Sequence, residues 1–426
     1  MKLLIVGGGG REHALATVLH RSPLKPELWA APGNPGIAQL ARCVPISADD
    51  IDQLVALAER ERFDLTVVGP EVPLTKGLVD RLEALGLPAF GPRASAAELE
   101  GSKAFAKALM QKAGIPTAAF MTTTVLTEAL AFVSTCPLPV VVKADGLAAG
   151  KGVIIASTRA EAEAAVRELM DARILGEAGA RLVIEEFLPG EEASFLAICD
   201  GEDALPLASA QDHKQVFDGD QGPNTGGMGV ISPTPLVTPA LEQRVLNDVI
   251  RPTLRAMQEA GRPFRGVLYA GLMIHQGVPR VLEFNARFGD PETQALLSRL
   301  DDDLLPVLLA AATGSLRGHR LRFKPGHAVT VVLAAKGYPG SFKKGMLIQG
   351  LEQELPPDVQ VYQAGTALDP QGRVVTSGGR VLAVTALGET FEQAHTRAYA
   401  ACDQLTWEEQ HYRRDIGHRS SRLGAS

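Results

Sequence analysis

Residues 281–292 read VLEFNARFGDPE and form the most informative stretch of the chain. Polar and apolar side chains alternate along it, which predicts a strand with Glu283, Asn285 and Arg287 on one face. Carboxylate and amide oxygens spaced two residues apart are ligands that suit Mg²⁺, and substrate phosphates usually complete the coordination shell of this ion. The alternative is an exposed amphipathic strand, although Asn is depleted in strands and a solvated face does not require it. The opposite face carries Phe284, Ala286 and Phe288.

A second chemical signal lies about 140 residues earlier, where the apolar run 140–143 ends on Lys143. Ligands of α/β sheets gather at this carboxyl end of a strand. The glycine-rich stretch 146–152 follows at once, but its glycines are too close together for a Walker A loop and no hydroxyl residue follows Lys151. We interpret it as a flap over triphosphate oxygens, with Gly150 in the turn and the two lysines as point charges. The alternative is a solvated pair of lysines beside a turn.

An acidic patch, EEFLPGEE, occupies residues 185–192. Segments of this kind offer adenine one backbone N–H and one backbone C=O, and offer the ribose a carboxylate. Acid-rich surface loops are common, so a solvated loop remains an alternative.

Two stretches, DHK at 212–214 and GPNTGGMG at 222–229, favour close approach of a ligand. The second is expected to be a loop too rich in Gly to pack a core, with exposed backbone N–H groups, and the alternative is a flexible linker. No two of the nine histidines have metal-ligand spacing, so His13 and His213 are interpreted as a helix-start and a loop residue.

The chain begins with an apolar run at 3–6 followed by GGGGRE at 7–12. A strand that opens through glycines into a helix presents backbone N–H groups and the helix dipole to a phosphate. Glu12 stands where a dinucleotide fingerprint needs its third Gly, so a nicotinamide cofactor is not expected. Asn34, in PGNPG at 32–36, is expected at the same edge of the sheet, and the alternative is a tight turn without a ligand.

The overall composition is that of a soluble chain of about 2–4 domains. The 426 residues carry 42 basic and 49 acidic side chains, a net charge of −7, which favours neither nucleic acid nor an anionic membrane. The four widely spaced cysteines suit free thiols in a cytoplasmic protein. Alternating apolar and amphipathic stretches in the first hundred residues predict βαβ units and a parallel sheet.

Ten motifs, spread over nearly the whole chain, resemble those of the phosphoribosylamine–glycine ligase (glycinamide ribonucleotide synthetase) family of the ATP-grasp superfamily. They are GGGGREHAL, PGNPG, GPEVPL, LEGSK, KADGLAAGKGV, EEFLPGEE, GPNTGGMG, LEFNARFGDPETQ, GYPG and TSGGRVL, and they follow the family's order. Gln215 is one departure, since a basic residue is expected after Lys214, and it puts one anion contact in question.

The resemblance implies an α/β fold with α+β parts, divided into three domains. Residues 1–103 form a Rossmann-like domain on the substrate phosphate side. Residues 104–325 form the ATP-grasp region, with a small lid subdomain at about 116–190, and residues 326–426 form a small, mostly β, C-terminal domain.

The resemblance also implies the reaction. ATP phosphorylates the carboxylate of glycine, and the amine of 5-phosphoribosylamine displaces phosphate to give glycinamide ribonucleotide, ADP and phosphate in purine biosynthesis. The implied cofactor is Mg²⁺ or Mn²⁺, the partners are small molecules, and a monomer is favoured.

Residue roles are carried over by motif. ATP is bound by Lys103, Lys143, Gly150, Lys151, Glu185, Glu186, Phe187, Leu188 and Glu192, and the metal by Glu283 and Asn285. Arg287 meets the glycine carboxylate and Asp290 the substrate amine, and with Lys143 these two make up the catalytic set. The remaining substrate contacts are Gly9, Gly10, Asn34, Asp212, Lys214, Asn224, Thr225 and Gly226.

Two other functions share these features. A different ATP-grasp carboxylate–amine ligase or carboxylase would keep the Lys143, Glu283 and Asn285 set and use another acid or amine. A non-catalytic nucleotide-binding module would bind ATP without releasing ADP, but such a module has little need for the metal pattern.

Overall fold

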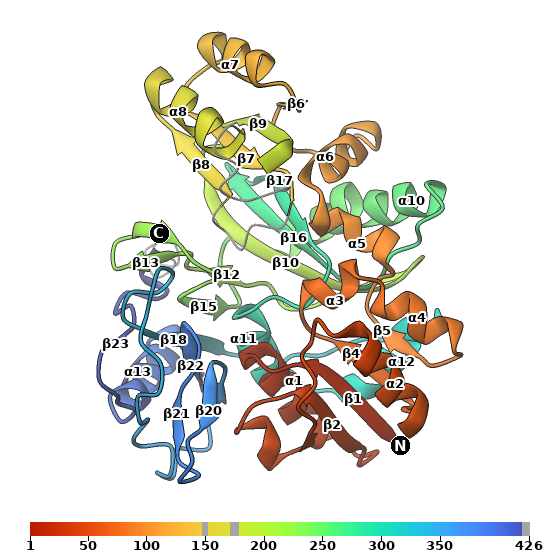
Figure 1. The fold of residues 1–426 in the computed structure, drawn as a ribbon, viewed down its shortest axis with the longest axis vertical. Coiled ribbons are helices and arrows are strands. Elements are labelled where there is room, and N and C mark those ends of the chain that lie inside the picture. Colours follow the sequence, from red (N-terminus) through yellow and green to blue (C-terminus); the bar gives the residue numbers. More distant parts are fainter. Residues whose placement is uncertain (147–151, 171–178, 420–426) are drawn as a thin grey trace.

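The N-terminal unit is a parallel sheet covered by helices. The computed structural model describes residues 1–146, 152–170 and 179–419, and Figure 1 shows this unit at the lower right. Its strands are β1 (Lys2–Gly7), β2 (Glu27–Pro32), β3 (Arg42–Cys43), β4 (Leu65–Val68) and β5 (Ala89–Phe90), in the order β3-β2-β1-β4-β5. Its helices are α1 (Gly10–His20), α2 (Ile51–Glu61), α3 (Glu71–Thr75), α4 (Leu78–Ala84) and α5 (Ala94–Gly101). The parallel sheet predicted from the alternating runs is therefore confirmed.

A small antiparallel sheet stands at the far end of the molecule, at the top of Figure 1. Its order is β6-β9-β7-β8, from β6 (Phe120–Thr123), β7 (Val140–Ala144), β8 (Val153–Ala156) and β9 (Leu182–Glu186). Val140 and Val142 pack into a core with α7 (Leu126–Thr135) and α8 (Arg159–Met170). The intervening residues of β7 therefore point to the opposite face, which looks toward the body of the molecule.

A larger antiparallel sheet lies in the middle, with the order β11-β10-β16-β17. Its strands are β10 (Glu191–Asp200), β11 (Ala204–Pro206), β16 (Arg265–His275) and β17 (Val278–Asn285). α6 (Lys103–Lys112), α9 (Pro239–Val245), a π-helical turn (Leu246–Ile250) and α10 (Arg251–Glu259) complete this region. Its buried side chains share one hydrophobic core with the first unit, so the two are packed firmly together.

The C-terminal sheet includes strands from the region before residue 326. Its order is β12-β15-β18-β22-β19, from β12 (Gln211–Asp212), β15 (Gly229–Ser232), β18 (His327–Ala335), β19 (Val359–Gln363) and β22 (Arg380–Gly388). A hairpin of β20 (Thr366–Leu368) and β21 (Val374–Thr376), helix α13 (Phe391–Cys402) and β23 (Gln410–His411) complete it, and α11 (Glu292–Ser298) and α12 (Leu304–Thr313) connect it to the rest.

The expectation that residues 222–229 form a loop is wrong at both ends of this stretch, whereas residues 225–228 lie between strands as expected. β14 (Gln221–Asn224) pairs with β13 (Gln215–Phe217), and Gly229 begins β15. Met228 is fully buried in a small cluster with Val216, Ala334 and Tyr338. Glycine is compatible with these strands because the segment packs closely: a Cβ at Gly229 would lie 2.7 Å from the Thr330 carbonyl oxygen.

The four cysteines are free thiols, as expected. Within the residues that the structure describes, no helix is both long enough and apolar enough to span a bilayer.

Candidate active site

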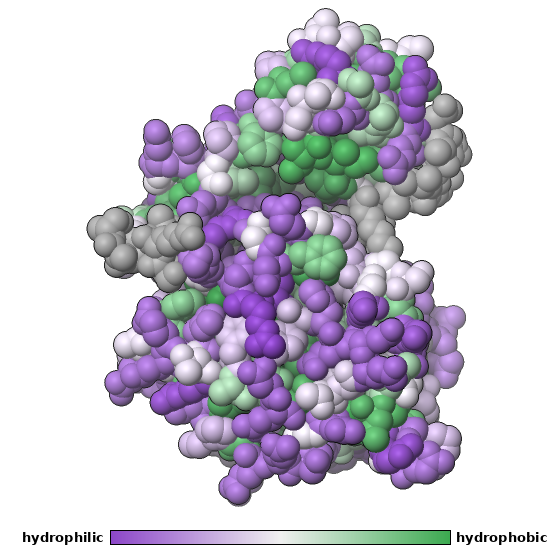
Figure 2. All heavy atoms as spheres, turned by 90° about the vertical axis from the view of Figure 1, so that its left-hand side faces the viewer, coloured by the Kyte–Doolittle hydropathy of each residue, from purple (hydrophilic) through white to green (hydrophobic). Residues whose placement is uncertain are grey.

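Three connected cavities run from the small sheet to the N-terminal unit. The upper cavity lies between the small sheet and the central sheet, and Figure 2 shows a hollow there with hydrophobic surface on its upper wall. It is lined by Val141, Ile155, Phe187, Met273 and Leu282 among others. Ile155 is 54% exposed and Phe187 38% exposed, so two large apolar side chains face this space without being covered. Such a slot suits the flat, apolar faces of a purine base.

The segment predicted to hold adenine borders the upper cavity, but its first carboxylate is already bound. Glu185 lies between two buried lysines, with Lys143 Nζ 3.1 Å from Oε1 and Lys107 Nζ 3.0 Å from Oε2. The Glu186 carboxylate accepts from Ala119 N–H and from Arg280. The predicted adenine contacts of 185–188 would therefore have to come from main-chain groups and from the Phe187 and Leu188 side chains, which line this cavity.

Lys107 is a buried residue of this region that no sequence motif predicted. Burial lowers the pKa of its amine to about 8, against the opposing effect of Glu185. Its Nζ also donates to Thr117 Oγ1 at 2.7 Å, and that hydroxyl donates to the Val281 carbonyl at 2.6 Å. Lys107 therefore ties α6 and the small sheet to the start of the 281–292 stretch. Its helical position among apolar residues gave no signal of this role.

The central cavity lies below the upper one and shares Glu283, Asp212 and Lys214 with it. Lys103 lines its wall and donates to the Gly146 carbonyl at 3.0 Å. Burial lowers the pKa of Lys103, although Glu283 raises it. Gly150 and Lys151, predicted to cover the phosphates, lie outside the described residues.

Glu283 and Asn285 are two groups of this cavity whose side chains are unpaired in the described part of the chain. Among the described residues, neither side chain has a hydrogen-bond partner, and no cation lies within ion-pair distance of the Glu283 carboxylate. Burial raises the pKa of Glu283, but the nearby charges of Lys214, Lys143, Lys103 and Arg287 outweigh it and the net pKa is lowered. The group is thus an ionised carboxylate with free oxygens.

These two residues fit a divalent cation bound jointly with phosphates. The searched part of the chain contains no cluster of three His, Cys, Asp or Glu able to hold a metal by itself. One carboxylate and one amide oxygen are the small protein share that Mg²⁺ commonly takes beside substrate phosphates.

Arg287 follows β17 and lies between two carboxylates. Its guanidinium is 3.0 Å from Glu100 Oε1 and 3.3 Å from Glu71 Oε2. Burial would lower the pKa of Arg287, but Glu100 and Glu71 raise it, so the guanidinium stays charged. Glu100, which also accepts from Ala286 N–H at 2.7 Å, fixes this arginine beside the strand and was not foreseen.

Asp212 and Lys214 lie where the upper and central cavities meet. Lys214 Nζ is 2.7 Å from Glu192 Oε2, so the carboxylate predicted for the ribose is paired here. Burial and then Glu292 raise the pKa of Asp212, and its Oδ1 has no hydrogen-bond partner. Thr225 holds the adjacent loops together, because its hydroxyl donates to the Lys214 carbonyl at 2.8 Å.

The remaining predicted residues of this region also border the upper cavity. Asn224 lines it from β14, opposite Gln215 in the register. The Gln215 carbonyl accepts from the buried Arg413 at 3.1 Å, and Arg419 lines the same cavity. Basic groups thus reach this wall from the C-terminal residues.

The third cavity, here called the turn cavity, is lined by the Gly7–Gly9 turn, Arg11, Asn34, Ser377 and Asp290. Gly10 begins α1, while the Gly9 N–H donates to Glu12 Oε2 at 2.7 Å. The Asn34 amide donates to the Gly8 and Gln363 carbonyls, both at 2.8 Å. Its side chain therefore shapes the turn and has no donor left for a phosphate.

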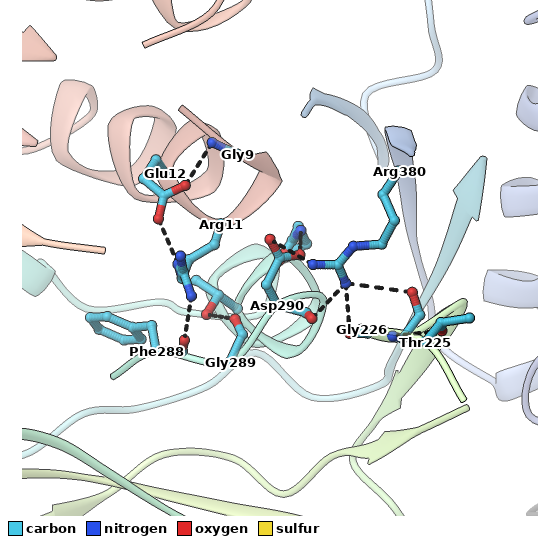
Figure 3. A network of polar contacts seen from close by, with 12 residues as sticks. Gly9, Arg11, Glu12, Thr225, Gly226, Phe288, Gly289, Asp290 and Arg380 are labelled. Atoms are coloured by element: carbon cyan, nitrogen blue, oxygen red, sulfur yellow. Dashed lines mark hydrogen bonds and ion pairs between the residues drawn. The ribbon is translucent and has the colours of Figure 1, made fainter. Parts of the chain in front are cut away.

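Asp290 borders both the central and the turn cavity. Figure 3 shows it between the glycine turn and Arg380, whose guanidinium approaches from the C-terminal sheet. Gln294 donates to Asp290 Oδ1 at 2.8 Å. Burial raises the pKa of Asp290, but Arg380, Arg11 and Arg287 outweigh it and the carboxyl stays ionised.

A nucleotide-sized slot between two antiparallel sheets, with lysines and a free carboxylate below it, defines the ATP-grasp ligases. This class uses ATP with a divalent cation. The chain matches the ATP-grasp (A) domain model of phosphoribosylglycinamide synthetase at residues 101–293, the N domain model at 1–100 and the C domain model at 328–419. The chain therefore belongs to the phosphoribosylglycinamide synthetase family.

Relatives and solved structures agree with this assignment. Phosphoribosylamine–glycine ligase of Xanthomonas axonopodis is 53% identical over 99% of this chain and 98% of its own, and that of Escherichia coli O6:H1 is 51% identical over 99% of both. The crystal structure of phosphoribosylamine–glycine ligase from Thermotoga maritima is 35% identical, with a TM-score of 0.85 over 98% of this chain and 100% of its own. Biotin carboxylase of Campylobacter jejuni, 15% identical with a TM-score of 0.75 over 96% of this chain and 92% of its own, shares the fold.

Proposed function

We propose that this chain joins glycine to 5-phosphoribosylamine at the expense of ATP, giving glycinamide ribonucleotide, ADP and phosphate for purine biosynthesis. The observation that carries the proposal is the free, ionised Glu283 beside Asn285, at the junction of a nucleotide cavity and a cavity that leads to the glycine turn. The names of the relatives that match over almost the whole chain support the choice of substrates.

In the first step, a glycine carboxylate oxygen attacks the γ-phosphorus of ATP, and the bond to the ADP oxygen breaks. Lys143 and Lys103 hold the phosphates as point charges, because both amines border the space beside Glu283. Glu283 and Asn285 would hold the divalent cation, which neutralises phosphate charge when bound. Gly150 and Lys151 of the glycine-rich stretch would cover the phosphates.

Adenine occupies the upper cavity and contacts the 185–188 segment, with Glu192 near the ribose. The glycine carboxylate lies near Arg287, whose charge is fixed in place by Glu71 and Glu100. The glycine ammonium faces Asp212, since Asp212 Oδ1 is buried without a partner. Lys214 and the loop of Asn224, Thr225 and Gly226 support this wall of the site.

In the second step, the amine nitrogen of 5-phosphoribosylamine attacks the glycyl carbonyl carbon, phosphate leaves with the bonding electrons, and the proton lost by the amine passes to the departing phosphate. Asp290 holds the amine by a hydrogen bond. Because its pKa is lowered, the carboxylate is a weak base, and orienting the amine is its main contribution. The phosphate end of this substrate meets the turn at Gly9 and the start of α1 at Gly10. The Gly9 N–H already donates to Glu12, so the helix start supplies the attraction for the phosphate, and Asn34 shapes the turn.

The oxygen donors of Glu283 and Asn285 suit Mg²⁺, with Mn²⁺ as a substitute of similar ligand preference. We place the activity in a monomer in the cytoplasm, because one chain supplies all the groups named and its four thiols are free.

The test is ADP release measured with ATP, Mg²⁺ and a panel of small amino acids, with and without freshly made 5-phosphoribosylamine. Turnover that requires both glycine and 5-phosphoribosylamine supports the proposal. Turnover with another acid or amine indicates a different ATP-grasp ligase, and ATP binding without ADP release under any combination indicates a binding module.

A further inference from the structure

Two C-terminal motifs, GYPG at 337–340 and TSGGRVL at 376–382, lie far along the chain from the residues of the nucleotide cavity, and the proposed reaction steps do not use them. The structure brings both onto a single residue of the GPNTGGMG stretch. Gly226 N–H donates to the Tyr338 hydroxyl at 3.1 Å, and the Gly226 carbonyl accepts from Arg380 at 2.7 Å.

Arg380 makes a second set of contacts, to Asp290. One guanidinium nitrogen donates to the Asp290 carbonyl at 2.7 Å, and the other lies 3.3 Å from the Asp290 carboxylate oxygen Oδ2. Arg380 therefore joins a backbone loop of the ATP-grasp region to both the backbone and the side chain of Asp290 (Figure 3). No other guanidinium of the described residues makes this connection.

The rest of the C-terminal sheet keeps this guanidinium in place. Arg380 begins β22 and pairs with Ala334 of β18. The Tyr338 ring packs directly on Gly379, where an added Cβ would lie 2.3 Å from the ring. Side chains larger than hydrogen at 379 would push Tyr338, and with it the acceptor of the Gly226 N–H, out of position.

Asp290 in turn lies against the N-terminal unit. A Cβ at Gly9 would lie 3.4 Å from Asp290 Oδ2, so the carboxylate faces the glycine turn directly. It borders the central cavity on one side and the turn cavity on the other. A shift of this carboxylate would change the position of a substrate group that reaches from the turn cavity into the central cavity.

We propose that Arg380 is a positioning residue for amine transfer, through which the C-terminal domain fixes Asp290 relative to the Gly226–Gly227 backbone. This inference rests on the proposed function and adds to it a role for the C-terminal sheet. The planar guanidinium suits the task because it satisfies two carbonyls and a carboxylate at once from a rigid frame, which a lysine amine cannot reproduce.

The test compares Arg380→Gln, Arg380→Lys and a matched control, Arg397→Gln. Arg397 also bridges a carboxylate and a carbonyl of the C-terminal sheet, at Asp358 and Leu387, away from the cavities. For Arg380→Gln we expect turnover with 5-phosphoribosylamine to fall on the order of 10²-fold, as misplacement of a reacting group does, while the Kd for ATP stays within about twofold. Arg380→Lys should recover about tenfold, because it restores the charge, and Arg397→Gln should behave like the wild type.

A double-mutant cycle with Asp290→Asn gives the sharper readout. If Arg380 acts by placing the Asp290 carboxylate, Arg380→Gln should cost no more than about threefold in the Asp290→Asn background. A folded Arg380→Gln variant with turnover within about twofold of the wild type, or losses that multiply in the double variant, would overturn the inference.

Should Arg380→Gln fail to fold, Tyr338→Phe takes its place, since it removes only the acceptor of the Gly226 N–H and keeps the ring on Gly379. We then expect a loss of roughly fivefold in turnover with unchanged ATP binding; wild-type turnover in both Tyr338→Phe and Arg380→Lys contradicts the inference. A wild-type enzyme that makes no glycinamide ribonucleotide points instead to failure of the proposed function.

Discussion

Glu283 is the residue on which the proposed metal site most depends, because its ionised carboxylate has no partner among the described residues. Glu283→Gln keeps the shape and removes the charge that faces the cation. We expect turnover to fall on the order of 10²-fold or more, by analogy with the loss of one preorganised electrostatic group. A titration of activity against Mg²⁺ concentration should also show a higher half-saturation point.

Phe284 provides the control on the same strand. It is 3% exposed and packs into the core on the opposite face of β17. Phe284→Leu should lower the free energy of unfolding by roughly 1 kcal/mol and leave the Mg²⁺ requirement unchanged. Full activity and an unaltered Mg²⁺ dependence in Glu283→Gln would mean that Glu283 is not a ligand.

His13 gives a prediction about pH. Burial lowers its pKa to about 4, and its Nδ1 accepts the Gln363 N–H at 2.8 Å. Between about pH 6.5 and about pH 4, His13 is protonated in the unfolded chain, where its pKa is near 6.5, but not in the folded chain. The free energy of unfolding that is fully present above about pH 6.5 is therefore lost as the pH falls toward about 4. This amounts to roughly 3 kcal/mol from this residue.

His13→Phe keeps a ring against Tyr362, which His13 contacts edge-on at 5.6 Å between centroids. It removes the titration and leaves the Gln363 N–H unpaired, so the variant should be about 1–2 kcal/mol less stable than the wild type at about pH 7.5. Denaturant unfolding at about pH 5 should show this difference closed or reversed. A constant difference across the range would show that His13 does not titrate as a buried neutral group.

The two faces of the β7–β8 hairpin have different roles: one lines the upper cavity, where ATP is proposed to bind, and the other packs into the hydrophobic core of the small sheet. Val141 and Ile155 lie opposite each other in the register and both line the upper cavity. Ile155→Ala should weaken ATP binding about tenfold, which corresponds to the loss of one to two buried methylenes. The melting temperature should hardly change, because this side chain is exposed without ligand.

Val142, one position along β7, is the matched control because its side chain is fully buried in the core under α7 and α8. Val142→Ala should lower the free energy of unfolding by roughly 2 kcal/mol and leave the Kd for ATP within about twofold. Calorimetric titration of both variants with ATP makes the comparison. If Ile155→Ala binds ATP as the wild type does, the base does not lie in the upper cavity.

Local sequence patterns predicted the strands of the site correctly, but they did not predict which side chains pair with one another. The apolar runs at 3–6 and 140–143 are strands, and alternation placed Glu283, Asn285 and Arg287 beside one cavity. Glu185 was expected to face adenine, yet its carboxylate is held by Lys107 and Lys143. The lysine on α6 comes from 78 residues away in the chain, and no local pattern reports such a contact.

At the scale of the whole molecule, the pairing of distant strands is what the sequence could not reveal. β12 and β15 join β18, about a hundred residues further on, so the C-terminal sheet contains strands from the predicted ATP-grasp region. Because of this strand pairing, Arg380 of the TSGGRVL motif lies beside Asp290. The two residues are 90 positions apart in the chain, so no local pattern could predict the contact. The domain boundaries at 103 and 326 remain predictions. The hydrophobic cores do not stop at them, because each of the two largest cores contains residues from more than one predicted domain.

In the reaction proposed above, ATP activates the carboxylate of glycine within a site built from all three domains. Glycine labelled with ¹⁸O in its carboxylate tests it most directly, in a reaction with ATP, Mg²⁺ and 5-phosphoribosylamine. We expect ADP to form and each phosphate released to carry one oxygen from glycine, because the acyl phosphate bond breaks on the carbon side when the amine attacks. Unlabelled phosphate, or AMP and pyrophosphate as products, would contradict it.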